Sequence, residues 1–133
     1  MSRRGRCREL AVLALATLAG CGSGGAERDA AGVLERFQDA AARGDGAAAC
    51  EQLAEETRSE LEKQEAKPCD EAVLGLGLSR ARVSRTVVDV TSAAVDLAGG
   101  GRAYLDKTPR GWKVSAAACR PQPGRPWDCE LKD

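Results

Sequence analysis

The spacing of apolar residues changes near residue 80, and this change limits the folds that the chain can adopt. Before it, apolar side chains recur every three or four residues, as at Leu34 and Phe37, which is the period of an amphipathic helix. After it, short β-branched or alternating runs lie between turn signals, and Trp112 and Val114 alternate with polar residues. Helices followed by strands predict an α+β domain in which N-terminal helices pack on one face of an antiparallel sheet.

The same patterns place the individual elements. Apolar periodicity predicts a helix over 28–43, a second over 47–64 and one more helical turn within 69–78. Gly44 suits the left-handed position that follows a helix, and Asp45 can cap the next one. Strands are predicted over 81–90, 92–98, 102–107 and 111–119, with hairpin turns at 98–102 and 108–111.

The first 21 residues have the organisation of an export signal. Four arginines precede a short apolar run, residues 10–18, which falls short of the roughly 20 residues that a membrane-spanning helix needs. The segment Leu18-Ala19-Gly20-Cys21 resembles the lipobox of bacterial lipoproteins. This resemblance implies that a lipid is attached to the Cys21 thiol and that the chain is cut before it. An ordinary signal peptide with a chance cysteine is the alternative.

These features predict three regions of the chain and its location in the cell. Residues 1–20 form a cleaved signal peptide, residues 21–29 a lipidated cysteine with a flexible glycine-rich tether, and residues 30–133 the folded domain. The lipid holds the protein at the extracytoplasmic face of the cell membrane. From 20 charges of each sign, cleavage removes four arginines and one glutamate, which leaves a net charge of −3. Because no clustered basic excess remains, nucleic acid is not expected as a partner.

Four cysteines remain for the exported domain: Cys50, Cys69, Cys119 and Cys129. An even number in an oxidising compartment predicts disulfides, and four cysteines allow three connectivities. We predict Cys50–Cys69 and Cys119–Cys129, because each pair is local and encloses a segment that must turn back. A zinc site is the alternative, but the chain has no histidine and no Cys-x-x-Cys pair. With only four aromatic residues in the mature chain the core is thin, so covalent cross-links are useful.

Several segments together resemble a group of small actinobacterial lipoproteins that is similar to the NTF2-like (SnoaL-like) superfamily. They are AARGD, AAAC, TRSEL and the closing GWKVSAAACRPQPGRPWDCEL, and the resemblance covers roughly residues 30–131. It implies a cone in which helices are wrapped by a curved antiparallel sheet. The chain is shorter than a full member of the superfamily, so the resemblance implies the fold without a complete deep pocket. It implies no reaction, because most members of this lipoprotein group have no assigned activity.

Related folds include enzymes that use an acidic residue as a general base inside the cone. Here the chain has no histidine and every thiol is claimed by lipid or disulfide, so acid–base chemistry would rest on carboxylates and a tyrosine. By alternation Asp96, Asp106 and Tyr104 lie opposite the apolar face, and only Asp89 is ambiguous. Two interpretations without a cofactor then remain, a non-catalytic binding or interaction domain and a purely structural surface lipoprotein, and we predict the first. The alternative is an enzyme, or a binder of a small hydrophobic ligand, that uses an acid in the cone.

Trp127 is the candidate contact residue. It lies in a proline-rich segment that the predicted Cys119–Cys129 disulfide closes into a loop, which would present the indole rigidly to a partner. The alternative is that Trp127 fills the open end of the core. The partners predicted are thus the membrane, through the lipid, and either another envelope protein or a small apolar ligand.

Overall fold

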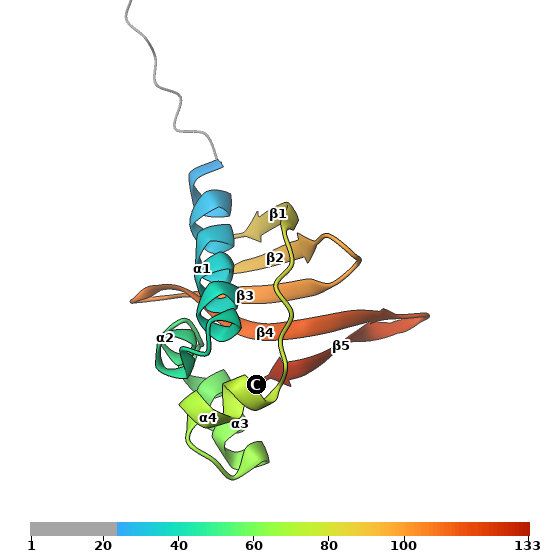
Figure 1. Cartoon of the computed structure of the whole chain (residues 1–133). Helices are drawn as coiled ribbons and strands as arrows, with labels where there is room; N and C mark the ends of the chain where they lie inside the picture. The colour runs from blue at the N-terminus through green and yellow to red at the C-terminus, as the bar shows by residue number, and fades with distance from the viewer. Residues whose placement is uncertain (1–23) are drawn as a thin grey trace, which may run out of the picture.

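The computed structural model of this chain describes residues 24–133 (Figure 1). The signal peptide, Cys21 and the first part of the predicted tether lie outside the described residues. Within residues 24–133 four helices precede five strands, which confirms the α+β class. The helices are α1 (Gly24–Ala42), α2 (Gly46–Glu51), α3 (Glu55–Glu65) and α4 (Cys69–Gly75). The strands are β1 (Val83–Asp89), β2 (Ser92–Leu97), β3 (Arg102–Thr108), β4 (Gly111–Gln122) and β5 (Arg125–Lys132).

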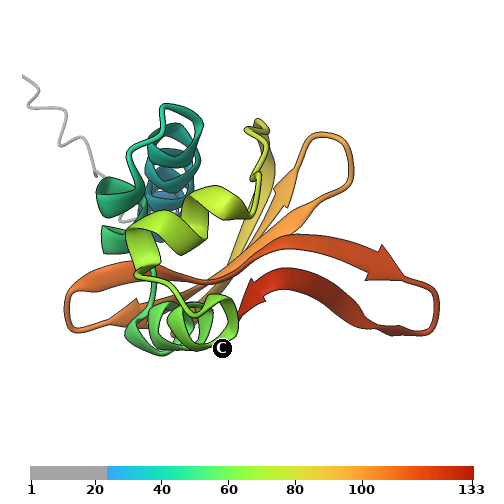
Figure 2. The same ribbon diagram turned by 60° about the horizontal axis from the view of Figure 1, so that its bottom comes forward.

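The five strands form one antiparallel sheet in the order of the sequence, β1-β2-β3-β4-β5. The sheet is curved but open, with β1 and β5 as its two edges (Figure 2). Helix α1 crosses one face, where Leu34 and Phe37 are buried together with Val95, Leu105 and Val114 of the strands. Helix α3 instead lies beside β4 and β5. The helices thus pack on the sheet as predicted only in part.

Helix α1 begins earlier than the sequence suggested. The prediction of a flexible tether up to residue 29 is wrong from Gly24 onward, because the helix begins there. Ala30 is fully buried and Ala26 packs against the core, so burial of this apolar stripe extends the helix. Glu27 adds a favourable charge in the first turn.

The predicted second helix over 47–64 is two helices. The chain leaves helical geometry at Gln52–Ala54, where Leu53 forms a parallel bridge with Val114 of β4. The Ala54 amide donates to the Val114 carbonyl at 2.9 Å, and the Val114 amide donates to the Gln52 carbonyl at 2.8 Å. Backbone hydrogen bonds to β4 therefore replace helical ones. The period of the apolar residues does not reveal this break.

Strand β4 carries two bulges that decide which way its small residues point. Tyr104 pairs with Ala116 while Leu105 pairs with Val114, which leaves Ser115 without a partner residue on β3. A second extra residue follows at Ala117–Ala118, and Ala118 has a left-handed φ of 53°. As a result Ala117 belongs to the core under the helices, whereas Ala116 and the nearby disulfide form a second cluster.

Both predicted disulfides are present, and one of them corrects the sequence prediction around it. Cys50–Cys69 joins α2 to the start of α4, and Cys119–Cys129 joins β4 to β5. The predicted proline-rich loop between Cys119 and Cys129 is wrong, because β4 and β5 continue through it as a hairpin that turns at Pro123-Gly124. Pro126 is tolerated because β5 is an edge strand, where a missing N–H need not break the ladder. Pro121 lies on β4 beyond its last pair with β3, Arg102 with Cys119, so its missing N–H costs no bond to β3.

Candidate functional site

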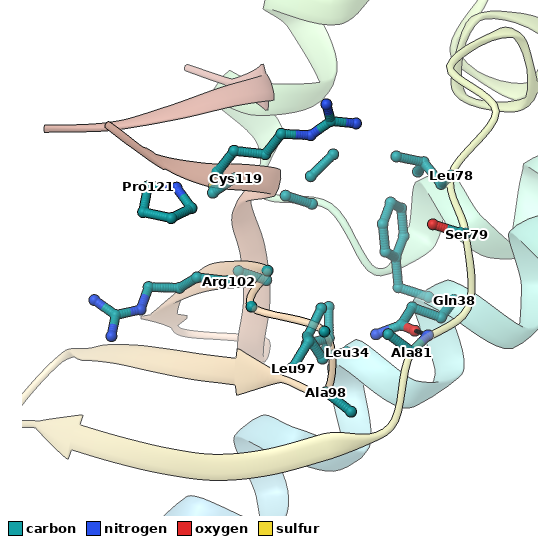
Figure 3. Close-up of a pocket in the computed structure, with 18 residues that line it drawn as sticks. Leu34, Gln38, Leu78, Ser79, Ala81, Leu97, Ala98, Arg102, Cys119 and Pro121 are labelled. Carbon is teal, nitrogen blue, oxygen red and sulfur yellow. Dashed lines mark hydrogen bonds between the residues drawn. The ribbon is translucent and has the colours of Figure 1, made fainter. Parts of the chain in front are cut away.

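A cavity of about 560 Å³ lies between α1, the connector that follows α4, and the far ends of β2, β3 and β4 (Figure 3). Leu34, Phe37 and Gln38 of α1 form one side together with the connector, and Arg102, Cys119 and Pro121 lie across from them. The remaining lining residues are Leu78, Ser79, Ala81, Leu97, Ala98, Gly99, Gly100, Gly101, Ala103, Ala117, Ala118 and Arg120. Most of these side chains are apolar and small.

Residues with small side chains or none surround the mouth of this cavity. The β2–β3 turn contains Gly99 and Gly100, whose φ angles of 94° and 93° suit glycine and provide no side chain. Ala98 follows the last residue of β2, and its amide donates to the Arg82 carbonyl at 2.8 Å, which fixes the turn against the connector. Ala98 and the two glycines are exposed. The cavity therefore opens to solvent beside a turn that is held in place.

Gln38 places a buried side-chain nitrogen without a partner in the wall of this cavity. Its side chain is only 6% exposed. The carboxamide oxygen accepts a hydrogen bond from the Ala81 amide at 2.6 Å, whereas the buried nitrogen, Nε2, has no partner in the described part of the chain. A buried donor without a partner costs about 1–3 kcal/mol. Nε2 is thus an unsatisfied donor in the wall of the cavity, and an acceptor on a bound molecule reaches it only when the side chains that cover it move aside.

Sequence reasoning did not identify Gln38. A signal was present, because this polar residue follows Phe37 and lies four positions after Leu34, on the apolar face of the predicted helix. A single glutamine on such a face does not reveal whether its amide is satisfied. That depends on the connector, whose Ala81 amide is 43 residues away in the sequence and meets only one of the two ends of the carboxamide.

The carboxylates considered for acid–base chemistry do not line the cavity. Asp89 and Asp106 are exposed on strands β1 and β3, and Asp96 is half-buried on β2. Asp96 and Tyr104 lie on the sheet face opposite α1, as alternation predicted, and the ambiguous Asp89 is exposed. The structure therefore does not bring these acids together with Gln38.

Trp127 lies on β5 in a half-buried position, packed against the cluster of Ala116 and the Cys119–Cys129 disulfide. The guanidinium of Arg102 stacks 4.4 Å from the centre of the Trp127 ring and 5.9 Å from that of Tyr104. Trp127 thus packs against the second hydrophobic cluster and not against the core under the helices. Its role as a contact to a partner stays a prediction.

The same arginine is fixed by Asp96. Its Nε donates to Asp96 Oδ1 at 2.6 Å, and both side chains are more than two-thirds buried. This hydrogen bond lowers the pKa of Asp96 below its ordinary value of 3.8 and raises the pKa of Arg102 above its usual range. The ion pair therefore holds the stacked guanidinium against the outer face of the sheet.

Acid should weaken the domain through this pair. A carboxyl whose pKa is lowered by folding stabilises the folded state above its unfolded pKa, and that contribution disappears as the pH falls through the folded pKa. We expect the free energy of unfolding to decrease from about pH 4 downward, and less steeply in Asp96→Asn than in the wild type. Urea denaturation over a series of pH values measures this. Equal slopes for the two proteins would contradict the assignment.

Comparison with known proteins adds no relative: no family model, no curated protein and no solved structure matches this chain. None of the helices between residues 24 and 133 is long and apolar enough to cross a membrane. The same residues contain no group of three or more histidine, cysteine or acidic side chains that could hold a metal ion. Fold and site together define an open-sheet α+β domain with an apolar cavity whose wall contains a buried donor without a partner, Nε2 of Gln38.

Proposed function

We propose that this chain is a small envelope lipoprotein of actinobacterial type, anchored by lipid on Cys21 at the extracytoplasmic face of the cell membrane. Residues 24–133 are then a non-catalytic binding domain of NTF2-like architecture. The lipobox resemblance supports the anchor. A long helix packed on a curved antiparallel sheet supports the architecture, with the sheet left open rather than wrapped into a complete cone.

The observation that carries the binding function is the cavity with the unpartnered Nε2 of Gln38. Its volume of about 560 Å³ falls in the range of small-molecule sites, about 300–1,000 Å³, which combine apolar walls with few polar groups. The ligand that fits is a small, mostly apolar molecule with one hydrogen-bond acceptor, such as a carbonyl or ether oxygen. Among residues 24–133 no carboxylate lines the cavity, so we propose binding rather than acid–base chemistry.

Binding can be tested with cyclohexanone, a neutral apolar probe with one carbonyl acceptor, by saturation-transfer NMR on the purified full chain. Gln38→Leu removes the donor and keeps the size of the side chain. We expect it to weaken binding about fivefold, since one hydrogen bond is worth about 1 kcal/mol. Ala98→Phe places a ring at the mouth and should abolish binding. Ala42→Phe, which changes an exposed alanine outside the lining, is the matched control.

The two variants separate the cavity from non-specific adsorption. If Ala98→Phe binds the probe as well as Ala42→Phe does, the cavity is not the site and the proposed binding function fails. If Gln38→Leu alone binds like the wild type, the apolar cavity stands but its donor does not select the ligand.

The anchor is tested separately. Cys21→Ser removes the acceptor of the lipid, so the precursor should stay uncleaved and unlipidated. The native protein should partition into the detergent phase of a Triton X-114 separation and carry an acylated N-terminal cysteine by mass spectrometry. Native protein found wholly in the aqueous phase would refute the anchor without bearing on the cavity.

A further inference from the structure

A second concave surface lies on the other flank of α1, where the β3–β4 turn approaches the helix. We call it the basic groove; it has a volume of about 340 Å³. Its charged lining residues are Arg28, Asp29, Arg36, Arg110 and Lys113, a net charge of +3, and the buried Trp112 also lines it. Residues 24–133 as a whole carry 16 basic and 19 acidic side chains, a net charge of −3. The groove therefore has the opposite sign to the domain around it.

Three of its cations are free to bind an anion. Arg28, Arg36 and Arg110 form no ion pair with any carboxylate between residues 24 and 133, whereas Lys113 already donates to the Glu51 carbonyl at 2.6 Å. The helical arginines fold back over glycines one turn earlier. A Cβ at Gly32 would lie 3.5 Å from Nη1 of Arg36, the nearest atom to it. Both guanidinium groups are thus directed toward the N-terminal end of α1.

The acidic side chains are concentrated at a different end of the domain from the basic groove. Residues 46–75, which include α2, α3 and α4, carry eight acidic and three basic side chains, a net charge of −5. Helices α3 and α4 lie at the end of the molecule opposite the start of α1 (Figure 1). An anionic surface would attract the basic groove and repel this acidic end.

From these observations we propose that the basic groove docks on a bilayer that contains anionic phospholipids and sets the orientation of the domain on it. The proposal rests on the proposed anchor for its geometry. Cys21 is three residues before Gly24, so it lies within about 11 Å of the start of α1. Measured along the helix axis from Gly24, Arg28 lies at about 6 Å and Arg36 at about 18 Å. Both therefore reach the headgroups only when α1 inclines toward the membrane plane.

Docking has a consequence for the cavity. Arg36 and Gln38 are two residues apart on α1, which places them about 200° apart around the helix. Arg36 lines the basic groove and Gln38 lines the cavity. When the groove contacts the headgroups, the mouth of the cavity faces away from the bilayer, so a ligand enters from the aqueous side.

The test uses the lipidated full chain in phosphatidylcholine vesicles with and without phosphatidylglycerol, with brominated acyl chains as the quencher. In a Trp127→Phe background Trp112, in the groove, is the only tryptophan. We expect its fluorescence to be quenched more strongly when phosphatidylglycerol is present and less strongly as salt is added. Arg28→Gln, Arg36→Gln and Arg110→Gln together should lower the docked-to-free ratio about a hundredfold, since each charge contributes about fivefold.

The matched control removes three positive charges from α3 and the segment after it, by Arg58→Gln, Lys63→Gln and Lys67→Gln. This variant should be quenched at least as strongly as the wild type. Equal quenching in the two vesicle types, or equal loss in both triple variants, would overturn the proposal. Release by millimolar inorganic phosphate with no dependence on phosphatidylglycerol would overturn it in favour of a small-anion site. Failure of the anchor is distinguishable, because an unlipidated chain would not float with pure phosphatidylcholine vesicles.

Discussion

Replacing Gly46 by alanine should destabilise the domain by about 3 kcal/mol. Gly46 is buried at the start of α2, directly against the backbone of α4. A Cβ at this position would lie 2.9 Å from the Cα atom of Asp70 and 2.7 Å from its carbonyl carbon, and closer still to the carbonyl oxygen. These are backbone atoms, so a side-chain rotation cannot relieve the overlap. The helices would have to separate.

The matched control is Gly75→Ala. Gly75 is the last residue of α4, and a Cβ there meets no atom within 4 Å. Alanine should leave stability unchanged or increase it by up to about 1 kcal/mol, because glycine is the poorer helix former. Urea denaturation of the two variants and the wild type compares them directly. If Gly46→Ala unfolds at the same urea concentration as the wild type, α2 and α4 are further apart in solution than in the structure.

The close contact at Gly46 marks the limit of what the sequence could predict. The spacing of apolar residues is a property of a single segment, so it can be read without knowing what the segment packs against. For that reason it predicted the α+β class and the strands that begin at Ser92 and Arg102. The close approach of α2 to α4, in contrast, depends on how two separate segments pack against each other. The break at Leu53 is of the same kind, because it requires the backbone of Val114 in a distant strand.

The local disulfides were predictable because each encloses a short segment that turns back, whereas the hairpin inside Cys119–Cys129 was not. Prolines in that segment argued against strands, and they are acceptable because Pro126 lies on the edge strand and Pro121 lies beyond the last pair of β4 with β3. The candidate site was the least predictable part. Which end of the Gln38 carboxamide is hydrogen-bonded depends on one backbone amide of the connector. The basic groove combines arginines of α1 with a hairpin turn about 80 residues further along the chain. The local pattern marks Gln38 only as a polar residue on an apolar helix face, and no local pattern marks the groove.

Removing the Cys50–Cys69 disulfide, by Cys50→Ala and Cys69→Ala together, should cost about 3 kcal/mol. The bridge closes a loop with a sequence separation of 19, and loops of this length are expected to lose about that much through the entropy of the unfolded chain. Both sulfurs lie in buried residues of the same core cluster, at 5% and 2% exposure, so the loss of packing adds to the effect. Non-reducing peptide mapping of the wild type should first show Cys50 joined to Cys69 and Cys119 joined to Cys129.

This disulfide and Gly46 should also be energetically coupled. The bridge holds the start of α4 against α2, and Asp70, the residue that a Cβ at Gly46 would strike, directly follows Cys69. In the variant without the bridge α4 can move away, so Gly46→Ala should cost at least about 1 kcal/mol less there than in the wild type. Neighbours that share a backbone shift show coupling of this size. A double-mutant cycle by urea denaturation measures it, and strictly additive effects would show that packing alone fixes α4, with the disulfide contributing only through the unfolded chain.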